Sequence, residues 1–538
     1  MVIKKNNIVF LGFFISLLTS MTSLQAVVYG KSFFVLPAFF RPASPEQIAA
    51  LRYQLQVGEA NKGCHQQFTV TPFGGGSVDS SKHLAEYFLP YHGGNKKTLI
   101  AGELGSQAVN DNSVDLIAKY FGVLTAPLPA NNDDQYFPSD YTFQSTLTFD
   151  PQQNFSGINF NYRWHLSRYL DKGFWIELGL PLTHVSNNLR MTEEITTAGG
   201  PTGNNPIVPE GYFGNMTQAL KQEAYNYGKI DGPVTKLGFG DLQFRVGYVY
   251  ANESHYYLNT YLGILVPMAS KPTNEFLFEP TIGSNGHFGG FSGASVGVRI
   301  WSRCEQSIYW ILDTAGTLLF STHQLRSIDL QGRPWSRYLP VFLSDSATQM
   351  NPGINLFTLP VEIVPDTVRD LNIAFVYKHE GFHAEFGYHF YGRSTEKIKT
   401  LHSINGTLAV ASDLNTVFDN TSSPNNVQYF YQDPADNQNA HNTKSYASIN
   451  RYLQINNDQS SPSGDFNLEY QPLTDADLDL TSAAHPPVVS NVFYVAIGKH
   501  LSNSTQPFFI GLGASYELPD DNAGITKMMA WLRMDLSF

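Results

Sequence analysis

In several segments of the sequence every second residue is apolar, and charged side chains recur at the positions between the apolar residues. Arg163, Arg245 and Arg533 each stand between apolar neighbours, and so do Glu177 and Glu385. Because successive side chains of a strand point to opposite faces, these charges would share one polar face. A face of this kind can guide ions through a pore, or its charges can neutralise one another and stiffen a wall. The candidate residues for lining such an interior are Arg163, Glu177, Arg245, Arg299, Asp313, Glu385, His389, Glu517 and Arg533.

The clearest element that would position these charges is a hairpin over residues 158–185. Two alternating segments of about 11–13 residues flank a turn near residues 169–173, which is enough to cross a bilayer when tilted. If Leu166 pairs with Phe174, then Arg163 lies opposite Glu177 on the polar face. The pattern therefore predicts a cross-strand ion pair.

The same alternation recurs near residues 242–266, 294–312, 369–394 and 489–518. Short turns separate the strands within these hairpins, and longer connections at 186–235, 268–286, 321–368 and 395–488 separate the hairpins. Eleven strands can be identified from Phe155 onward, with a weaker one at about 141–150. Segments Lys31–Phe40 and Gln66–Gly74 could add two more. We therefore predict about 14 strands, within a range of 12–16.

The chain closes on alternating Leu532, Met534, Leu536 and Phe538. A terminal strand of this pattern resembles the assembly signal of bacterial, Gram-negative-type outer-membrane β-barrels. The resemblance implies an all-β fold, namely a transmembrane antiparallel up-and-down barrel with short periplasmic turns and long extracellular loops. It also implies the cell outer membrane as location, with outer-membrane lipid and the barrel-assembly machinery as partners; an oligomer stays open.

The first residues agree with export. Lys4 and Lys5 precede an apolar run from Ile8 to about Leu18, and a cleavage site follows Ala26, which is the pattern of a signal peptide. Charged residues make up only 15% of the chain and aromatic residues 14%, whereas soluble domains carry about 25% charged residues. The net charge of −12 argues against a nucleic-acid partner.

We divide the chain into a signal peptide at 1–26, an N-terminal region at 27–140 and a barrel at 141–538 with long loops 186–235, 321–368 and 395–488. Residues 27–140 would supply the first strands and short helices, or form a plug or periplasmic element. The 401–480 segment is rich in Asn, Asp, Ser and Gln, so it cannot bury much apolar surface by itself.

Other chemistries have weaker support. Cys64 and Cys304 are the 2 cysteines, and a disulfide or two separate thiols are both open. His383 and Glu385 share a strand face, but a metal site needs further converging ligands. We therefore expect no metal, no cofactor and no enzymatic activity.

The functional prediction is a porin or passive transporter of small solutes through a polar lumen. One alternative is a surface adhesin or structural barrel with a closed interior. The other is a transporter of hydrophobic compounds with an N-terminal plug.

Overall fold

The computed structural model describes residues 27–35, 65–78, 81–90, 94–101, 113–115, 143–166, 173–197, 213, 215–253, 255–343, 346–365, 367–411, 432–433, 438–439, 470–501 and 508–538. Strands dominate these residues. Among the helices in these ranges, none has both the length and the apolar character to cross a membrane.

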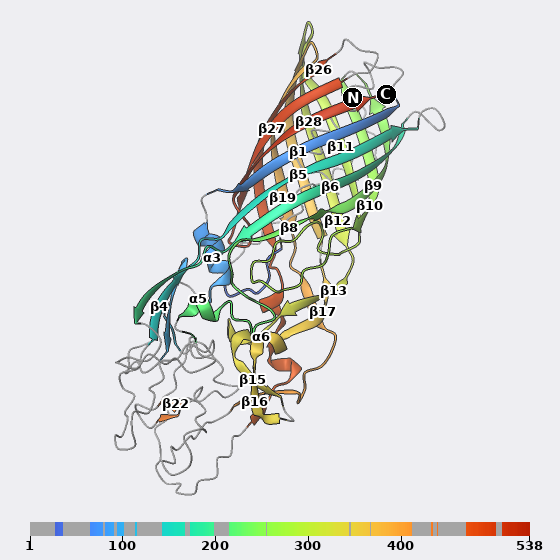
Figure 1. Ribbon diagram of the computed structural model, residues 1–538. Coiled ribbons are helices and arrows are strands. Elements are labelled where there is room, and N and C mark those ends of the chain that lie inside the picture. The colour runs from blue at the N-terminus through green and yellow to red at the C-terminus, as the bar shows by residue number, and fades with distance from the viewer. Residues whose placement is uncertain are drawn as a thin grey trace, which may run out of the picture.

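Antiparallel strands close into one barrel of 12 strands, with a further strand, β8 (Val234–Phe239), outside the ring (Figure 1). In order around the wall, the barrel strands are β1 (Gln66–Ser77), β5 (Gln152–His165), β6 (Phe174–Asn188), β9 (Asp241–Asn252), β10 (Tyr256–Pro267), β11 (Gly289–Arg303), β12 (Gln306–Leu319), β18 (Thr367–His379), β19 (Phe382–Arg393), β26 (Val488–Leu501), β27 (Phe508–Pro519) and β28 (Lys527–Ser537). Strand β1 closes the ring because it pairs with both β5 and β28. The predicted up-and-down barrel is confirmed.

The register of the first predicted hairpin is also confirmed. The Leu166 amide donates to the Phe174 carbonyl at 2.9 Å, and Arg163 lies opposite Glu177. The short turns lie at one end of the barrel together with the C-terminal Phe538, and we call this the turn end (Figure 1). We call the opposite end the loop end.

The preferred count of 14 strands is too high by two, although 12 lies within the predicted range. From β5 to the end of the chain the barrel has eleven strands, as expected. The twelfth is β1, which contains the Gln66–Gly74 segment. The weak strand near 141–150 is β4 (Phe143–Thr148), which lies outside the barrel because it pairs with β2 (Lys96–Ala101) and β7 (Thr192–Thr197). In the Lys31–Phe40 segment, the described residues 31–35 form no strand.

The two faces of the wall differ in polarity. Outward Leu178, Phe386 and Leu512 are 44%, 56% and 55% exposed, whereas inward Glu177 and Glu385 are each 3% exposed. Alternation thus puts the apolar row outside and the charges inside, as a wall surrounded by lipid requires. The fold is an up-and-down transmembrane β-barrel of the outer-membrane type.

Large aromatic side chains lie flat on the inner wall, each over a glycine of a neighbouring strand. A Cβ on Gly247 would meet the Trp175 ring at 2.1 Å, and one on Gly513 would meet the Trp531 ring at 2.2 Å. Since any larger residue would collide with the ring, glycine is required at these positions by close approach.

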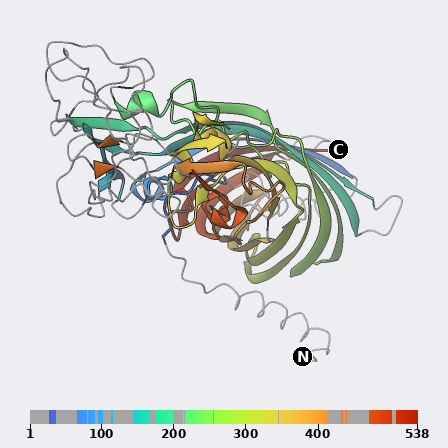
Figure 2. The same cartoon turned by 90° about the horizontal axis from the view of Figure 1, so that it is seen from below.

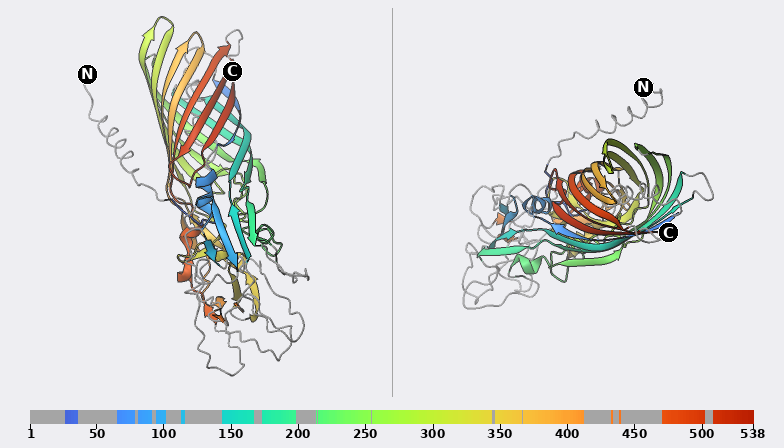
Figure 3. Two further views of the ribbon diagram at one scale, coloured as in Figure 1. Left: turned by 90° about the vertical axis from the view of Figure 1, so that its left-hand side faces the viewer. Right: turned by 90° about the horizontal axis from the view of Figure 1, so that it is seen from above.

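At the loop end, the connections form a folded unit that we call the cap (Figure 2). Three barrel strands have short continuations in the cap: β13 (Thr322–Ser327) follows β12, β17 (Thr358–Val364) precedes β18, and β20 (Lys397–Thr400) follows β19. These three strands pair with one another in the same order as the barrel strands that they extend. In the same way, β4 and β7 extend β5 and β6 into a sheet that projects from the barrel (Figure 3). The described parts of the predicted long loops therefore contain strands and helices.

The remaining cap strands are β3 (Ser113–Asp115), β14 (Asp329–Leu330), β15 (Pro340–Leu343), β16 (Ser346–Pro352), β21 (Leu408–Ala411), β22 (Gln432–Asp433), β23 (Gln438–Asn439), β24 (Tyr470–Pro472) and β25 (Leu478–Asp479). The helices are α3 (Ser81–Phe88), α5 (Met216–Ala219), α6 (Gly353–Leu356), η1 (Ser336–Tyr338), η2 (Asp475–Asp477) and η3 (Leu480–Ala483). Leu473 and Leu478 belong to a buried core together with Val361. The end of the polar 401–480 segment thus gains its buried surface from other parts of the cap.

The predicted N-terminal region is divided between the two units. Residues 27–35 and α3 lie in the cap, whereas β1 is part of the barrel wall. Much of the remainder of 27–140 lies outside the described residues.

Candidate functional site

The barrel interior contains a charged cluster across three neighbouring strands. The register sets Glu177 of β6 between Arg163 of β5 and Arg245 of β9. Arg163 Nε donates to Glu177 Oε2 at 3.0 Å, and Arg245 Nη1 donates to Glu177 Oε1 at 2.7 Å. All three side chains are at most 3% exposed, so one carboxylate holds two buried guanidinium groups.

Aromatic and amide groups fix this cluster in place. The Arg163 guanidinium lies 3.9 Å from the centre of the Trp175 ring, and Trp175 Nε1 donates to Asn259 Oδ1 at 3.0 Å. Arg245 Nη2 donates to Gln243 Oε1 at 2.6 Å. The cluster is thus tied to four adjacent strands, β5, β6, β9 and β10.

A second cluster lies at the seam where the last strand meets the first. Arg533 Nε donates to Asp535 Oδ1 at 2.9 Å, and the Thr69 hydroxyl donates to the same oxygen at 2.6 Å. Asp535 was not among the predicted lumen residues, although it shares the parity of Arg533. The alternation of polar and apolar residues alone could have identified Asp535 as a lumen residue.

Acidic groups gather on the opposite part of the wall, on β12, β18 and β19. His389 Nε2 lies 2.7 Å from Asp370 Oδ1, and Asn372 Nδ2 donates to Asp313 Oδ2 at 3.3 Å. The Tyr494 hydroxyl donates to Glu385 Oε1 at 2.5 Å. The carboxylates of Asp313, Asp370 and Glu385 therefore lie on a different part of the wall from Arg163, Arg245 and Arg533.

The other candidates lie toward the two ends. Lys527 Nζ and Glu517 Oε2 form an ion pair at 3.1 Å at the loop end. Arg299 is half-buried near the turn end, where the exposed Cys304 forms part of the β11–β12 turn. Cys64 lies outside the described residues, so the disulfide stays a prediction.

The described residues do not support a metal site at His383 and Glu385. His383 stacks edge-on with His500, with ring centres 5.1 Å apart, and Glu385 contacts Tyr494. Among the residues that the structure describes, no group of three or more His, Cys, Asp or Glu side chains converges as metal ligands.

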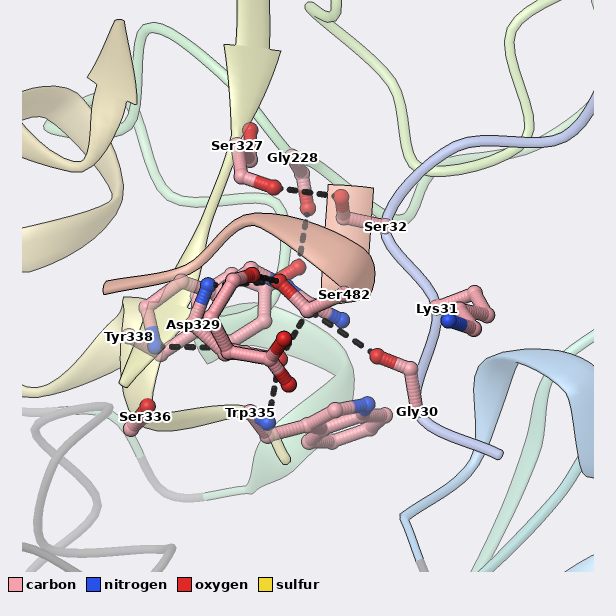
Figure 4. Close-up of polar contacts among 12 residues, drawn as sticks. Gly30, Lys31, Ser32, Gly228, Ser327, Asp329, Trp335, Ser336, Tyr338 and Ser482 are labelled. Atoms are coloured by element: carbon pink, nitrogen blue, oxygen red, sulfur yellow. Dashed lines mark hydrogen bonds and ion pairs between the residues drawn. The ribbon is translucent and has the colours of Figure 1, made fainter. Parts of the chain in front are cut away.

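Residues 27–35, which we call the strap, lie across the cap (Figure 4). The Gly30 and Lys31 amides donate to the carbonyls of Leu89 and Tyr87 at 2.9 and 2.8 Å. Asn522, in the β27–β28 connection, accepts from the Val28 amide at 3.1 Å and donates to its carbonyl at 2.5 Å. The strap therefore joins the α3 segment to the mouth of the barrel.

Asp329 organises the cap beside the strap (Figure 4). It accepts from the backbone amides of Trp335 and Arg337 at 3.1 and 2.8 Å, and from Arg337 Nη1 at 2.6 Å. The same Nη1 donates to the Gly30 carbonyl at 3.0 Å. Burial raises the pKa of Asp329 to about 6, although Arg337 acts in the opposite direction.

A second buried ion group lies under the strap. Glu396 pairs with Arg393 at 2.7 Å and with Arg326 at 3.5 Å, and the Arg326 guanidinium lies 3.2 Å from the centre of the Phe33 ring. Burial alone would raise the pKa of Glu396, but the two arginines hold it below its usual value. The strap is thus anchored by a cation–π contact as well as by hydrogen bonds.

Phe34 of the strap enters a cluster of aromatic rings. Its ring centre lies 5.2 Å from that of Tyr87, 5.8 Å from Phe278 and 5.4 Å from His485. The same apolar core continues into the loop-end part of the barrel wall, where it includes Trp531. Sequence reasoning missed this cluster because its members come from distant, individually unremarkable segments.

Comparisons with known proteins give structural likeness only. No protein-family model matches the chain, and no curated protein sequence matches it. An outer membrane channel from Pseudomonas putida is similar at a TM-score of 0.36 and 8% identity, over 88% of this chain and 96% of that one.

Two further solved structures are similar over 88% of this chain and 90% of their own. The Ralstonia pickettii toluene transporter TbuX gives a TM-score of 0.24 at 7% identity, and a Pseudomonas aeruginosa FadL homologue gives 0.26 at 8%. All three TM-scores are below 0.5.

Proposed function

We propose that this protein is an outer-membrane transporter of hydrophobic compounds whose resting state is closed, and that it is not an open porin. An open porin lines a water-filled lumen with accessible charges. Here Arg163, Glu177 and Arg245 are buried and paired. Of the three predicted functions, the hydrophobic-compound transporter therefore fits better than the open polar pore.

The observation that carries the proposal is the continuous apolar core of cap and barrel. Phe34 of the strap, Phe278 of the cap and Trp531 of the inner wall belong to one cluster. An apolar surface that extends from the cap to the inner wall suits a hydrophobic compound better than a hydrated ion. Displacement of the strap would expose this surface.

Uptake by intact cells tests the proposal. Cells with the protein in their outer membrane should take up naphthalene faster than cells without it, while glucose uptake stays unchanged. Equal naphthalene uptake combined with unchanged glucose uptake would contradict transport and favour a structural barrel with a closed interior. Faster glucose uptake would favour the porin.

A cysteine pair would test the role of the strap. Val28→Cys with Asn522→Cys, in a Cys64→Ser/Cys304→Ser background, places thiols where the strap contacts the barrel mouth. Oxidation should reduce naphthalene uptake, and reductant should restore it. The Cys-free background without the pair is the control, and its uptake should not respond to reductant.

A further inference from the structure

The outer wall at the loop end presents an exposed apolar ledge. Phe288, Leu318 and Phe320 are 42%, 51% and 49% exposed. The rings of Phe288 and Phe320 stack with centres 5.8 Å apart at an interplanar angle of 14°. The ledge ends the apolar outer row of β12, at the level where aromatic residues meet the membrane interface.

Cations gather just beyond this ledge, on the outward side of the cap strands that continue the wall. Lys271 Nζ donates to the carbonyl of the exposed His323 on β13 at 3.0 Å. Lys399 is 67% exposed and lies 3.7 Å from Glu362. Lys397 is also exposed and shares its face with Lys399, because the buried Ile398 separates them.

One more cation lies on the outer wall beside the ledge, on the neighbouring strand β18. Arg369 has the outward parity of β18 and lies opposite Gly316 of β12 and Gly392 of β19. The described surface therefore has four cations, with Glu362 beside Lys399, on a chain whose net charge is −12. A local basic surface above an apolar ledge matches an amphiphile with an anionic head.

The spread of the cations selects among anionic lipids. Lys271 contacts β13, whereas Lys397 and Lys399 lie on β20, with β17 between these strands. Two strand spacings span about 10 Å, which is wide for a single phosphate but fits two phosphates on one headgroup.

We propose that this surface, formed by Phe288, Leu318 and Phe320 with Lys271, Arg369, Lys397 and Lys399, binds a bisphosphorylated glycolipid of the outer leaflet. The phosphates lie against the cations, and the acyl chains lie along the ledge. Such a lipid would fasten the cap strands to the membrane surface and leave the lumen and strap untouched.

Native mass spectrometry of the full folded chain in detergent tests the proposal with three probes: bisphosphorylated lipid A, monophosphorylated lipid A and phosphatidylglycerol. The Lys271→Gln/Lys397→Gln/Lys399→Gln variant should retain bisphosphorylated lipid A about tenfold less than the unchanged protein, since each cation near an anionic headgroup contributes to binding. Lys499→Gln is the matched control, because Lys499 is exposed at the turn end of β26, and its retention should equal that of the unchanged protein.

The probes also separate the lipid classes. Bisphosphorylated lipid A should bind more tightly than the monophosphorylated form, and both more tightly than phosphatidylglycerol. Equal retention by the triple variant and the unchanged protein would overturn the proposal. Equal binding of phosphatidylglycerol and bisphosphorylated lipid A would overturn the glycolipid assignment.

Discussion

The barrel wall and the cap are held together in different ways. In the wall, most strands pair with their neighbours in sequence, as in the Arg163–Glu177 hairpin. In the cap, Arg337 holds Gly30 across 307 positions and Trp335 Nε1 donates to the Phe88 carbonyl across 247. Wall segments can thus form from local pairing, whereas the cap needs segments that meet only after the chain has folded back.

The two regions also use buried charge differently. In the wall, Glu177 lies between two arginines on strands fixed by the barrel hydrogen bonds. In the cap, Asp329 binds one arginine and two backbone amides, and so shapes the turn itself. Removing each carboxylate should therefore damage its own region.

Glu177→Ala should be the most damaging change to the wall. It leaves Arg163 and Arg245 buried without their shared carboxylate, a loss that costs about 3–5 kcal/mol. The temperature at which the folded barrel loses its fast gel migration should fall, while cap proteolysis changes little at low temperature. Glu253→Ala, in the exposed β9–β10 turn, is the control; an equal effect of both changes would contradict the buried cluster.

Asp329→Ala should loosen the cap and leave the barrel folded. The change removes the partner of the buried Arg337 and of two amides, at a cost of about 3 kcal/mol. Limited proteolysis should then cut the cap sooner, whereas heat-modifiable gel migration should persist. The exposed Asp231 offers a matched Asp→Ala control. If the barrel unfolded together with the cap, the two regions would not be separable.

Sequence reasoning succeeded where a local pattern determines the outcome. The alternation between Ile158 and Leu166 was sufficient for the hairpin register, because one slip would turn the charges toward lipid. The two strands by which the preferred count exceeds 12 are β4, which pairs with β2 and β7 outside the barrel, and the Lys31–Phe40 segment, whose described residues 31–35 form no strand. Alternation identifies a strand without identifying its sheet.

The cap could not be predicted in this way. Phe34, Tyr87 and His485 form one cluster, but nothing near each residue signals the other two. The strap likewise contacts Asn522 across 494 positions. These contacts form because closure of the barrel brings segments that are far apart in the sequence next to one another. A local periodicity cannot predict them.

Gly247→Ala should test the close contacts on the inner wall. A Cβ there would lie 2.1 Å from the Trp175 ring, and forcing it in should cost about 1–3 kcal/mol. Gly316→Ala is the matched control, since a Cβ at Gly316 meets nothing within 4 Å. The urea concentration at the unfolding midpoint should be lower for Gly247→Ala than for Gly316→Ala. Equal midpoints would contradict the close contact between Gly247 and the Trp175 ring.

Acidification should weaken the cap through the buried His485. Burial, and secondarily Arg393, lowers the pKa of His485 from 6.5 to about 3. The neutral ring is thus favoured in the folded cap, so stability present above pH 6.5 declines as the pH falls toward 3. At pH 5 the loss should be about 1–2 kcal/mol, seen as faster amide exchange around the strap.

The raised pKa of Asp329 acts in the opposite direction, because its protonation near pH 6 favours the folded cap as the pH falls. His485→Gln removes the titrating ring and should flatten the decline in cap protection between pH 7 and 5. An unchanged decline would assign the pH dependence to other groups.

The central claim, that the resting lumen is closed, is tested most directly by the conductance of the full chain in planar bilayers. Arg163, Glu177 and Arg245 are buried and paired, so we predict a silent bilayer after verified insertion of the folded protein. Steady conductance steps from protein whose cap is shown by limited proteolysis to be intact would contradict a closed lumen and favour the open porin.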